Sequence, residues 1–285
     1  MFGREIEEGG RRRAARRLGS IWSRRRPAHG GGVHPRVLHE SARVKLSILF
    51  PVYNEAATVR EILDAVLAFS MEGLEKEVLI IEGNSTDGTK AIVGEYAGRP
   101  GVRVFYEERP RGKGAAVRTG LREMAGDVLL IQDGDLEYKV SDYPKVLGPI
   151  LQGDAEIVFG SRARDPQTHW QYRQFRGLER LYGFWVNLGG VLFTGLFNFL
   201  YGTRITDGAT MFKVYRKEVF DGFTLKSDGF DFDWEMQGWA AKRGRRFHEV
   251  PISYKARSRA EGKKIVFWRD GIRVLWAILK YRFVD

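Results

Sequence analysis

The chain has 285 residues, of which 43% are hydrophobic and 29% are charged. This length and composition are typical of a globular protein with a full hydrophobic core, and they exclude a fibrous, collagen-like or wholly disordered chain. Because the chain has no cysteine, a disulfide framework, a thiolate zinc site and a cysteine nucleophile are also excluded.

The net charge of +11 is unevenly distributed along the chain. Residues 1–43 carry a net charge of +7 and residues 242–285 carry +9, which leaves −5 for residues 44–241. Basic ends favour polyanionic partners such as an anionic membrane surface, a phosphorylated ligand or nucleic acid. The arginine clusters of residues 1–43 precede no apolar run of signal-peptide type, and we expect this segment to be disordered.

From residue 44 onward, short apolar runs alternate with segments of helical periodicity. The expected strands cover residues 44–50, 77–81, 102–106, 128–131 and 156–159. The expected helices lie at about 59–67, 89–96, 112–125 and 141–151. This alternation predicts an α/β fold with a mostly parallel, Rossmann-like sheet and helices on both faces.

Two apolar segments follow the predicted sheet. Residues 183–201 carry no charge and are long enough to span a bilayer, but their four glycines and two asparagines make a weak spanning segment. An interfacial or re-entrant helix pair and a plain core helix are the alternatives. Residues 265–283 predict an amphipathic helix with basic flanks, which suits a membrane surface or packing on its own domain. Its predicted apolar face consists of Ile265, Trp268, Ile272, Leu275, Trp276, Leu279 and Phe283.

The ends of the predicted strands carry polar motifs, and ligands of open parallel sheets bind beyond these ends. The motifs read PVYNE at 51–55, EGNSTDGT at 82–89 and DGD at 133–135. Neighbouring carboxylates repel unless a cation lies between them, and Mg²⁺ is commonly held by one or two carboxylates together with phosphate and water. Asp133 and Asp135 therefore predict a metal site for a diphosphate substrate, with Glu137 as a third ligand. A solvated turn is the alternative.

Three further groups lie at the same predicted edge. Glu82 ends a strand with a carboxylate that suits a base or a ribose, and Asn54 and Glu55 follow the first strand. Lys113 stands between two glycines at a predicted helix start, where a phosphate binds well. The alternatives are a helix N-cap for Asn54 and a solvated loop for Lys113.

Together these motifs resemble family 2 glycosyltransferases of the GT-A fold, above all the dolichol-phosphate mannose synthase-like branch. The matching segments are PVYNE, NSTDGT, RGKGAAVRTGL, GDVLLIQDGDLEY, VFGSR and TDGATMFKVYRKEV. They extend from about Lys45 to Lys264, roughly three quarters of the chain. One motif departs from the family: its usual D-D-G-S reads Glu82-Gly83-Asn84-Ser85 here, so the second acid is missing.

The resemblance implies an inverting transferase that uses a UDP- or GDP-linked sugar donor with Mg²⁺ or Mn²⁺. The metal ligands that it implies are Asp133, Asp135 and Glu137. The nucleotide site that it implies consists of Pro51, Tyr53, Glu55, Glu82, Lys113 and Asp133, with Glu82 against the base. The catalytic residues that it implies are Asp135, Asp207 near the acceptor, and Arg162 near the phosphates or the acceptor.

The acceptor decides what else the reaction needs. A hydroxyl acceptor needs a general base, for which Asp207 is the first candidate and Asp233 or Glu235 the second. A polyprenyl phosphate is already anionic and needs cations instead; the candidates are Arg257, Arg259, Lys263 and Lys264. We expect a polyprenyl phosphate acceptor and a chain that is peripherally attached to the cytoplasmic face of a membrane. A soluble or polysaccharide hydroxyl acceptor is the alternative.

Two other classes of function are considered. A sugar-phosphate nucleotidyltransferase would carry a Gly-rich basic loop after the first strand, where this chain has Asn54 and Glu55. The Arg-rich arm suits nonspecific nucleic-acid binding with a steep salt dependence, but the acidic body argues against specific recognition. The expected organisation is an arm at 1–43, a GT-A domain at 44–264 and a membrane-facing basic helix at 265–285.

Overall fold

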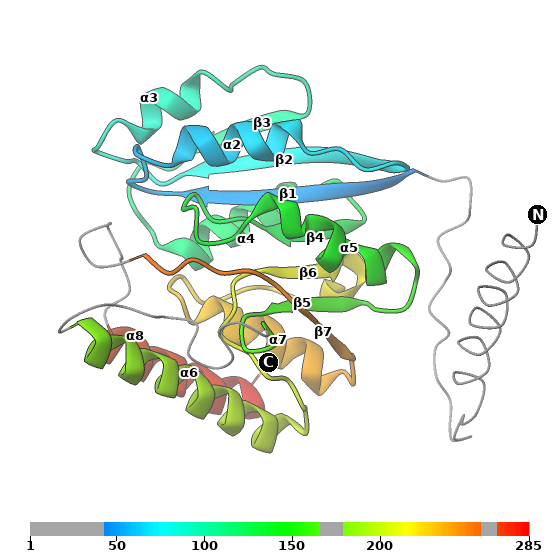
Figure 1. Cartoon of the computed structure of the whole chain (residues 1–285), viewed down its shortest axis with the longest axis vertical. Helices are drawn as coiled ribbons and strands as arrows, with labels where there is room; N and C mark the ends of the chain where they lie inside the picture. Colours follow the sequence, from blue (N-terminus) through cyan, green and yellow to red (C-terminus); the bar gives the residue numbers. More distant parts are fainter. Residues whose placement is uncertain (1–42, 166–178, 258–266, 285) are drawn as a thin grey trace, which may run out of the picture. The chain divides into compact units, whose positions relative to one another are not determined.

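A computed structural model describes residues 43–165, 179–257 and 267–284 (Figure 1). One seven-stranded sheet has the strand order β3-β2-β1-β4-β6-β5-β7. The strands are β1 (Val44–Val52), β2 (Leu74–Glu82), β3 (Val102–Tyr106), β4 (Val128–Ile131), β5 (Ile157–Ser161), β6 (Lys213–Arg216) and β7 (Phe247–Pro251). The predicted disordered arm lies outside the described residues, apart from Arg43.

The sheet is mostly parallel, as predicted. β1 pairs in parallel with β2 and β4, and β2 pairs in parallel with β3. β6 runs antiparallel to its neighbours β4 and β5, whereas β7 pairs in parallel with β5. The carboxyl ends of β1, β2 and β4 therefore meet at one edge, which is where the predicted motifs stand.

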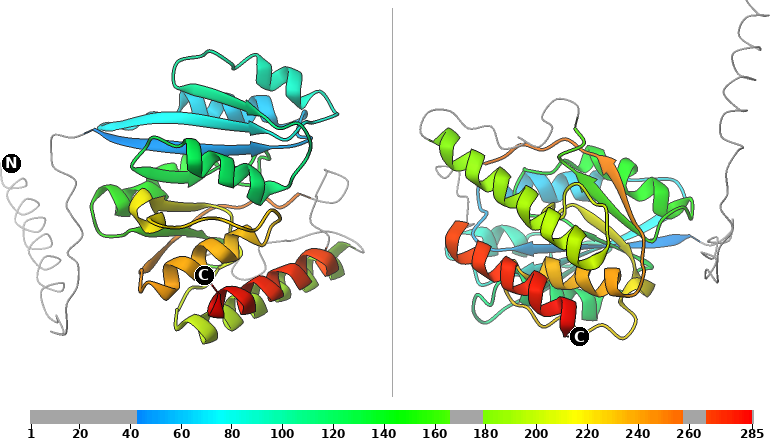
Figure 2. Two further views of the ribbon diagram at one scale, coloured as in Figure 1. Left: turned by 180° about the vertical axis from the view of Figure 1, so that it is seen from behind. Right: turned by 90° about the horizontal axis from the view of Figure 1, so that it is seen from below.

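Helices cover both faces of the sheet, and each face has its own hydrophobic core (Figures 1 and 2). The first face packs against α2 (Val59–Ala68), α3 (Thr89–Gly94) and α5 (Tyr143–Leu151). The second packs against α4 (Lys113–Glu123), α6 (Glu179–Tyr201), α7 (Phe232–Lys242) and α8 (Phe267–Phe283). Ile48 of β1 joins the first core and Leu49 the second, as expected for a strand that is buried on both sides.

The sequence predicts neither β6 nor β7. β6 has only four residues, and it begins and ends with the buried cationic side chains of Lys213 and Arg216. Lys213 is ion-paired with Asp233, and Arg216 donates to the carbonyl oxygen of Ile150 at 2.9 Å. Cationic residues are rarely buried without such partners, and the partners are far away in sequence. Because the strand begins and ends with a cationic residue, its sequence does not resemble that of a buried strand, and β6 is not predicted from the sequence.

The C-terminal helix α8 packs beside α6 and against α7 (Figure 2). It is buried through Ala277, Ile278 and Tyr281. The apolar face that its periodicity predicts points outward instead, with Ile272 67% exposed and Trp276 65% exposed. The helix thus packs on its own domain and also presents an apolar outer face. Ile265 and the side chain of Trp268 lie outside the described part.

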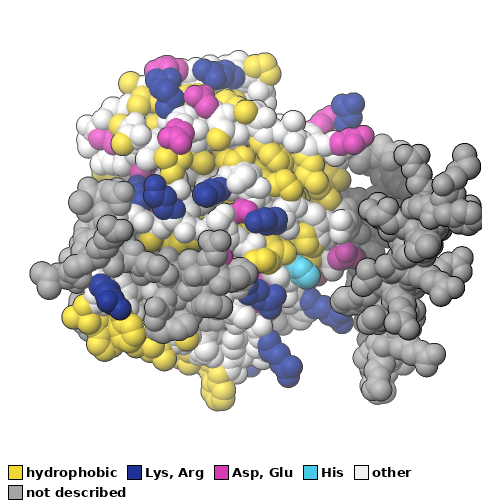
Figure 3. All heavy atoms as spheres, viewed as in Figure 1, with side chains coloured by type: hydrophobic (Ala, Val, Ile, Leu, Met, Phe, Trp, Pro, Cys, Tyr) yellow, Lys and Arg dark blue, Asp and Glu magenta, His cyan; other side chains and the backbone are white. Residues whose placement is uncertain are grey.

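The outer faces of α6 and α8 together form what we call the apolar platform, part of which is visible in Figure 3. Its exposed members are Leu181, Phe184, Trp185, Val191, Leu192, Phe199, Ile272, Leu275, Trp276, Leu279 and Phe283. Among the described helices, α6 alone is long and apolar enough to cross a membrane, by length and composition only. Since 28% of its stretch Gly183–Tyr201 is buried, it is not a fully enclosed core helix.

The first turn of α4 leaves no space for a side chain at Gly114. A Cβ atom there would lie 2.8 Å from Cβ of Phe232 and 2.9 Å from the carbonyl carbon of Asp228. We expect Gly114→Ala to lower the free energy of unfolding by about 1–3 kcal/mol through overpacking, as measured by denaturant titration. The control Gly148→Ala in α5 meets no atom within 4 Å and should stabilise by about 0.5–1 kcal/mol. Equal effects of the two substitutions would contradict this explanation.

Candidate active site

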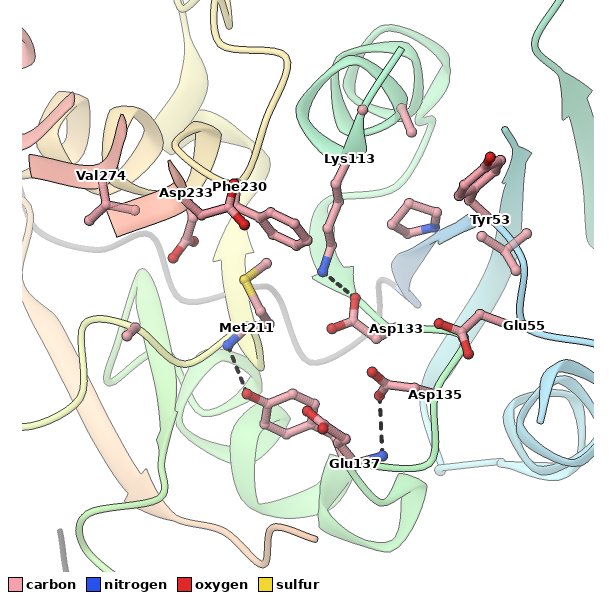
Figure 4. Close-up of a pocket in the computed structure, with 18 of the residues that line it drawn as sticks. Tyr53, Glu55, Lys113, Asp133, Asp135, Glu137, Met211, Phe230, Asp233 and Val274 are labelled. Carbon is pink, nitrogen blue, oxygen red and sulfur yellow. Dashed lines mark hydrogen bonds and ion pairs between the residues drawn. The ribbon is translucent and has the colours of Figure 1, made fainter. Parts of the chain in front are cut away.

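A pocket of about 490 Å³ lies at the carboxyl edge of the sheet (Figure 4). Its lining comes from residues at or just beyond the ends of β1 to β5, from α4, and from α6, α7 and α8. The predicted site residues that line the pocket are Pro51, Tyr53, Glu55, Lys113, Asp133, Asp135, Glu137, Arg162 and Arg257. The fold thus brings together most of the predicted site.

The loop after β1 is tied to the NSTDGT segment. The hydroxyl of Ser85 accepts from the backbone N–H of Asn54 at 3.0 Å, and the hydroxyl of Thr89 accepts from that of Glu55 at 2.8 Å. Asn54 has a φ of 50°, in the left-handed region that asparagine tolerates. The alternative of a helix cap at Asn54 is wrong, because Thr58 is the N-cap residue of α2. Asn54 instead fixes the loop that carries the pocket wall.

Glu82 is fully buried at the end of β2. Its carboxylate accepts from the backbone N–H of Asn84 at 3.1 Å and from that of Ser85 at 2.8 Å. Within the described chain, the pocket lining includes Gly83 but not Glu82. This geometry favours a role of Glu82 in shaping the turn over the direct contact with a base that the resemblance implies.

Asp133 follows β4 and is ion-paired with Lys113 at the start of α4 (Figure 4). The start of α4 is fixed because the backbone N–H of Gly114 donates to the carbonyl oxygen of Asp228 at 2.8 Å. Gly112 precedes the helix with a φ of 104°, a conformation that favours glycine. Lys113 therefore lines the pocket, where its partner in the described structure is Asp133.

Arg257 bridges three carboxylates at this end of the pocket. Its guanidinium lies 2.7 and 3.2 Å from the oxygens of Glu55 and 2.7 Å from Oδ2 of Asp135. Its backbone N–H donates to Glu137 at 2.8 Å, and the hydroxyl of Tyr254 donates to the other oxygen of Glu137 at 2.7 Å. The predicted phosphate ligand Arg257 is thus held by the predicted metal and nucleotide residues.

The pocket has an excess of negative charge. Burial raises the pKa of Asp135 to about 7; the charges of Asp133 and Glu137 add to the rise, and Arg257 and Lys113 oppose it. The cationic side chains in the described lining are Arg111, Lys113, Arg162 and Arg257. The carboxylates are Glu55, Glu107, Asp133, Asp135, Glu137, Asp233 and Asp270. A further cation would stabilise this arrangement.

The residues fit a divalent ion that is held by two carboxylates. Asp133 and Asp135 are the oxygen ligands that Mg²⁺ takes together with phosphate and water. Glu137, the predicted third ligand, has both oxygens engaged by Tyr254 and Arg257. Across residues 43–165, 179–257 and 267–284, no three His, Cys, Asp or Glu side chains are grouped as a metal site.

Arg162 is part of the pocket lining, although its side chain is only 1% exposed. Asp207 accepts from Nε of Arg162 at 2.7 Å and from Nη2 at 2.8 Å. Asp207 is buried and is not part of the described lining. A general base must reach the proton that it removes. The geometry therefore favours an Asp207 that orients Arg162 over one that acts as a base.

Of the two second candidates for a base, Asp233 lines the pocket and Glu235 does not. Glu235 accepts from the backbone N–H groups of Lys226 and Ser227, each at 2.8 Å. It therefore anchors the loop before α7. Asp233 is ion-paired with Lys213 of β6.

Two features of the pocket are not anticipated from the sequence. Glu107, just beyond β3, is ion-paired with Arg111 at 2.7 Å, and both line the pocket. The strand-end rule applied to β3 would have found Glu107. The apolar lining from α6 and α8, such as Phe193 and Val274, depends on the packing of distant helices. The predicted acceptor cations Arg259, Lys263 and Lys264 lie outside the described residues.

Comparison with known proteins identifies several relatives of the chain. It matches the family "Glycosyl transferase family 2" over residues 47–223. The glycosyltransferase AglJ of Haloferax volcanii is 32% identical over 79% of this chain and 67% of that protein. A dolichol-phosphate mannosyltransferase of Pyrococcus furiosus is 26% identical over 84% of this chain and 64% of that protein. An undecaprenyl-phosphate 4-deoxy-4-formamido-L-arabinose transferase of Edwardsiella ictaluri is 26% identical over 76% of this chain and 62% of that protein.

Solved structures share the fold. The glucosyl-3-phosphoglycerate synthase of Mycobacterium tuberculosis, in complex with Mn²⁺, UDP and phosphoglyceric acid, has a TM-score of 0.61 at 17% identity. This match covers 90% of this chain and 85% of that one. The mannosyl-3-phosphoglycerate synthase of Rubrobacter xylanophilus has a TM-score of 0.57 at 19% identity. This match covers 84% of this chain and 72% of that one. With the family match and the 32% identity, the chain belongs to glycosyl transferase family 2, in its dolichol-phosphate mannose synthase-like branch.

Proposed function

We propose that the chain is an inverting glycosyltransferase that moves a sugar from a nucleotide-sugar donor to a polyprenyl phosphate at the cytoplasmic face of a membrane. One observation carries the proposal. The same pocket has a carboxylate-rich end at the strand edge and an apolar end between α6 and α8, whose outer faces are exposed and apolar. A charged donor and a lipid acceptor need these two environments side by side.

The donor binds at the carboxylate-rich end, with UDP or GDP as its leaving group. Asp133 and Asp135 hold Mg²⁺ or Mn²⁺, which supplies the positive charge that the departing diphosphate needs. Pro51, Tyr53 and Glu55 frame the nucleotide, and Lys113 turns from Asp133 to a phosphate oxygen. The solved relative that holds both Mn²⁺ and UDP supports this assignment.

The reaction is a single in-line displacement with inversion. The bond from the anomeric carbon to the diphosphate oxygen breaks as a bond to an oxygen of the acceptor phosphate forms, through an oxocarbenium-like transition state. The acceptor oxygen is already anionic, so no proton has to be removed. A general base is therefore not required, which agrees with the buried position of Asp207.

Cationic side chains bind the acceptor phosphate. We assign Arg257 to this phosphate; its Nε forms no hydrogen bond within the described chain and lies 3.9 Å from Oε1 of Glu137. Arg162 belongs to the pocket lining and is oriented by Asp207. We assign Arg259, Lys263 and Lys264 to the same phosphate, since they lie two to seven residues after Arg257 in the chain. The polyprenyl-phosphate relatives support this acceptor class.

The apolar platform attaches the chain to the membrane, with the tryptophans Trp185 and Trp276 at the interface. Trp276 is 65% exposed, so Trp276→Asp should lower vesicle affinity by about tenfold or more without destabilising the fold. The measurement is co-sedimentation with anionic phospholipid vesicles. Tyr106→Asp on β3, also exposed, is the matched control and should bind as the wild type does. Equal binding of both variants would contradict attachment through the platform.

The function is tested with the purified chain, Mn²⁺, polyprenyl phosphate and a panel of radiolabelled UDP- and GDP-sugars. We expect labelled sugar to become extractable into organic solvent with one of the donors. Transfer only to a water-soluble acceptor, without detergent, would favour a hydroxyl acceptor instead. No transfer from any donor to either acceptor class would contradict the proposal.

A further inference from the structure

A second carboxylate, separate from the Asp133–Asp135 cluster, lies at the α7 wall of the pocket. Asp233 stands in the first turn of α7, and Figure 4 shows it on the other side of Phe230 from Lys113 and Asp133. Its side chain is 4% exposed, yet it belongs to the pocket lining. The mechanism proposed above uses neither Asp233 nor its partner Lys213.

Lys213 holds this carboxylate from behind the pocket. The Lys213 ammonium is fully buried, contacts Oδ2 of Asp233 and donates to the carbonyl oxygen of Gly208 at 2.9 Å. Gln237 donates to the same Oδ2 at 3.4 Å. In the described structure, both hydrogen bonds that side chains donate to Asp233 thus end on one oxygen. The lone pairs of Oδ1 are left for a ligand in the pocket.

The surroundings of Asp233 define the chemistry of that ligand. Burial raises the pKa of Asp233, and the ion pair with Lys213 opposes this rise and favours the charged form. A buried carboxylate repels a phosphate, so the part of the donor that meets it must be neutral and must donate hydrogen bonds. Phe230 and Trp234, which line the pocket beside it, offer apolar surface for C–H groups. A sugar ring has both features, whereas a nucleoside diphosphate lacks them at its phosphates.

We propose that Asp233 accepts a hydrogen bond from a hydroxyl of the transferred sugar and so selects which sugar the enzyme takes. The proposal rests on the proposed function, because it presupposes a nucleotide-sugar donor. Lys213 is the positioning residue that fixes the rotamer of the carboxylate. A site built to bind a hydroxyl group discriminates strongly against ligands that lack it, since the buried acceptor is then unpaired.

The test compares the binding of complete donors with that of their leaving groups. Affinities for UDP, GDP, UDP-glucose, UDP-N-acetylglucosamine and GDP-mannose, each with Mn²⁺, are measured by calorimetry for the wild type and Asp233→Asn. Asp231→Asn is the matched control, since it removes the same charge two residues away, outside the described pocket lining. Asp233→Asn/Lys213→Met removes both buried charges together, which guards against misfolding from an unpaired lysine.

We expect Asp233→Asn and the double variant to weaken the preferred nucleotide sugar by about 10- to 100-fold and to leave its nucleoside diphosphate unchanged. Asp231→Asn should bind both as the wild type does. Equal weakening of sugar nucleotide and nucleoside diphosphate, or no weakening of either, would overturn the role of Asp233. A wild type that binds none of the five ligands would instead overturn the proposed function itself.

Discussion

Asp135→Asn should lower turnover by at least about 10³-fold, the largest effect that we expect from a single substitution. Metal stabilisation of the leaving group contributes several kcal/mol to the transition state, and each 1.36 kcal/mol corresponds to a factor of ten in rate. The measurement is the initial rate of sugar transfer at saturating Mn²⁺. The fold should survive, because Arg257 keeps its contacts with Glu55 and Glu137.

The matched control for this experiment is Asp154→Asn, which removes an exposed carboxylate beyond α5. It should leave both the rate and the melting temperature unchanged. Near-wild-type turnover of Asp135→Asn would contradict the metal assignment. A large drop in its melting temperature would mean that the carboxylate serves the fold rather than the reaction.

Arg257→Met should reduce both stability and turnover. Removing one partner of a buried ion pair costs about 3–5 kcal/mol, and the 15% exposure of Arg257 favours the lower end of that range. Turnover should fall by about 10²-fold, because charge-assisted hydrogen bonds to the acceptor phosphate are also lost. Denaturant titration and transfer rates measure the two effects.

The change in melting temperature on adding Mn²⁺ tests the role of Arg257 more specifically than stability or turnover alone. Since Mn²⁺ would replace part of the missing positive charge, it should raise the melting temperature of Arg257→Met more than that of the wild type. Arg43→Met breaks an exposed ion pair with Glu75 and should change stability by less than about 1 kcal/mol, with no added response to Mn²⁺. Identical Mn²⁺ responses of Arg257→Met and the wild type would contradict the charge balance described above.

The sequence predicts the part of the site that follows directly from strands. Asp133, Lys113 and Glu55 lie within a few residues of well-marked strand or helix ends, and parallel pairing brings those ends together. Residues 102–106 and 128–131 are strands with the predicted bounds, since their apolar runs are bracketed by polar turns. Local pattern therefore suffices for this half of the pocket.

The other half depends on contacts between distant residues. Arg257 reaches Asp135 across 122 positions, and Asp207 meets Arg162 across 45. No periodicity reveals that Asp207 is engaged by an arginine or that Glu82 caps a turn. The apolar stripe of α8 is visible in the sequence, but a stripe does not tell which face packs inward. Here the smaller face with Ala277 is buried.

The paired aspartates are tested most directly by a crystal structure of the chain with Mn²⁺ and the nucleoside diphosphate that binds best. The account predicts an anomalous manganese peak in contact with Asp133 and Asp135 and with the diphosphate oxygens. In that structure Lys113 should have left Asp133 for a phosphate. A bound nucleotide with no manganese beside these two residues, and with the Lys113–Asp133 pair unbroken, would contradict it.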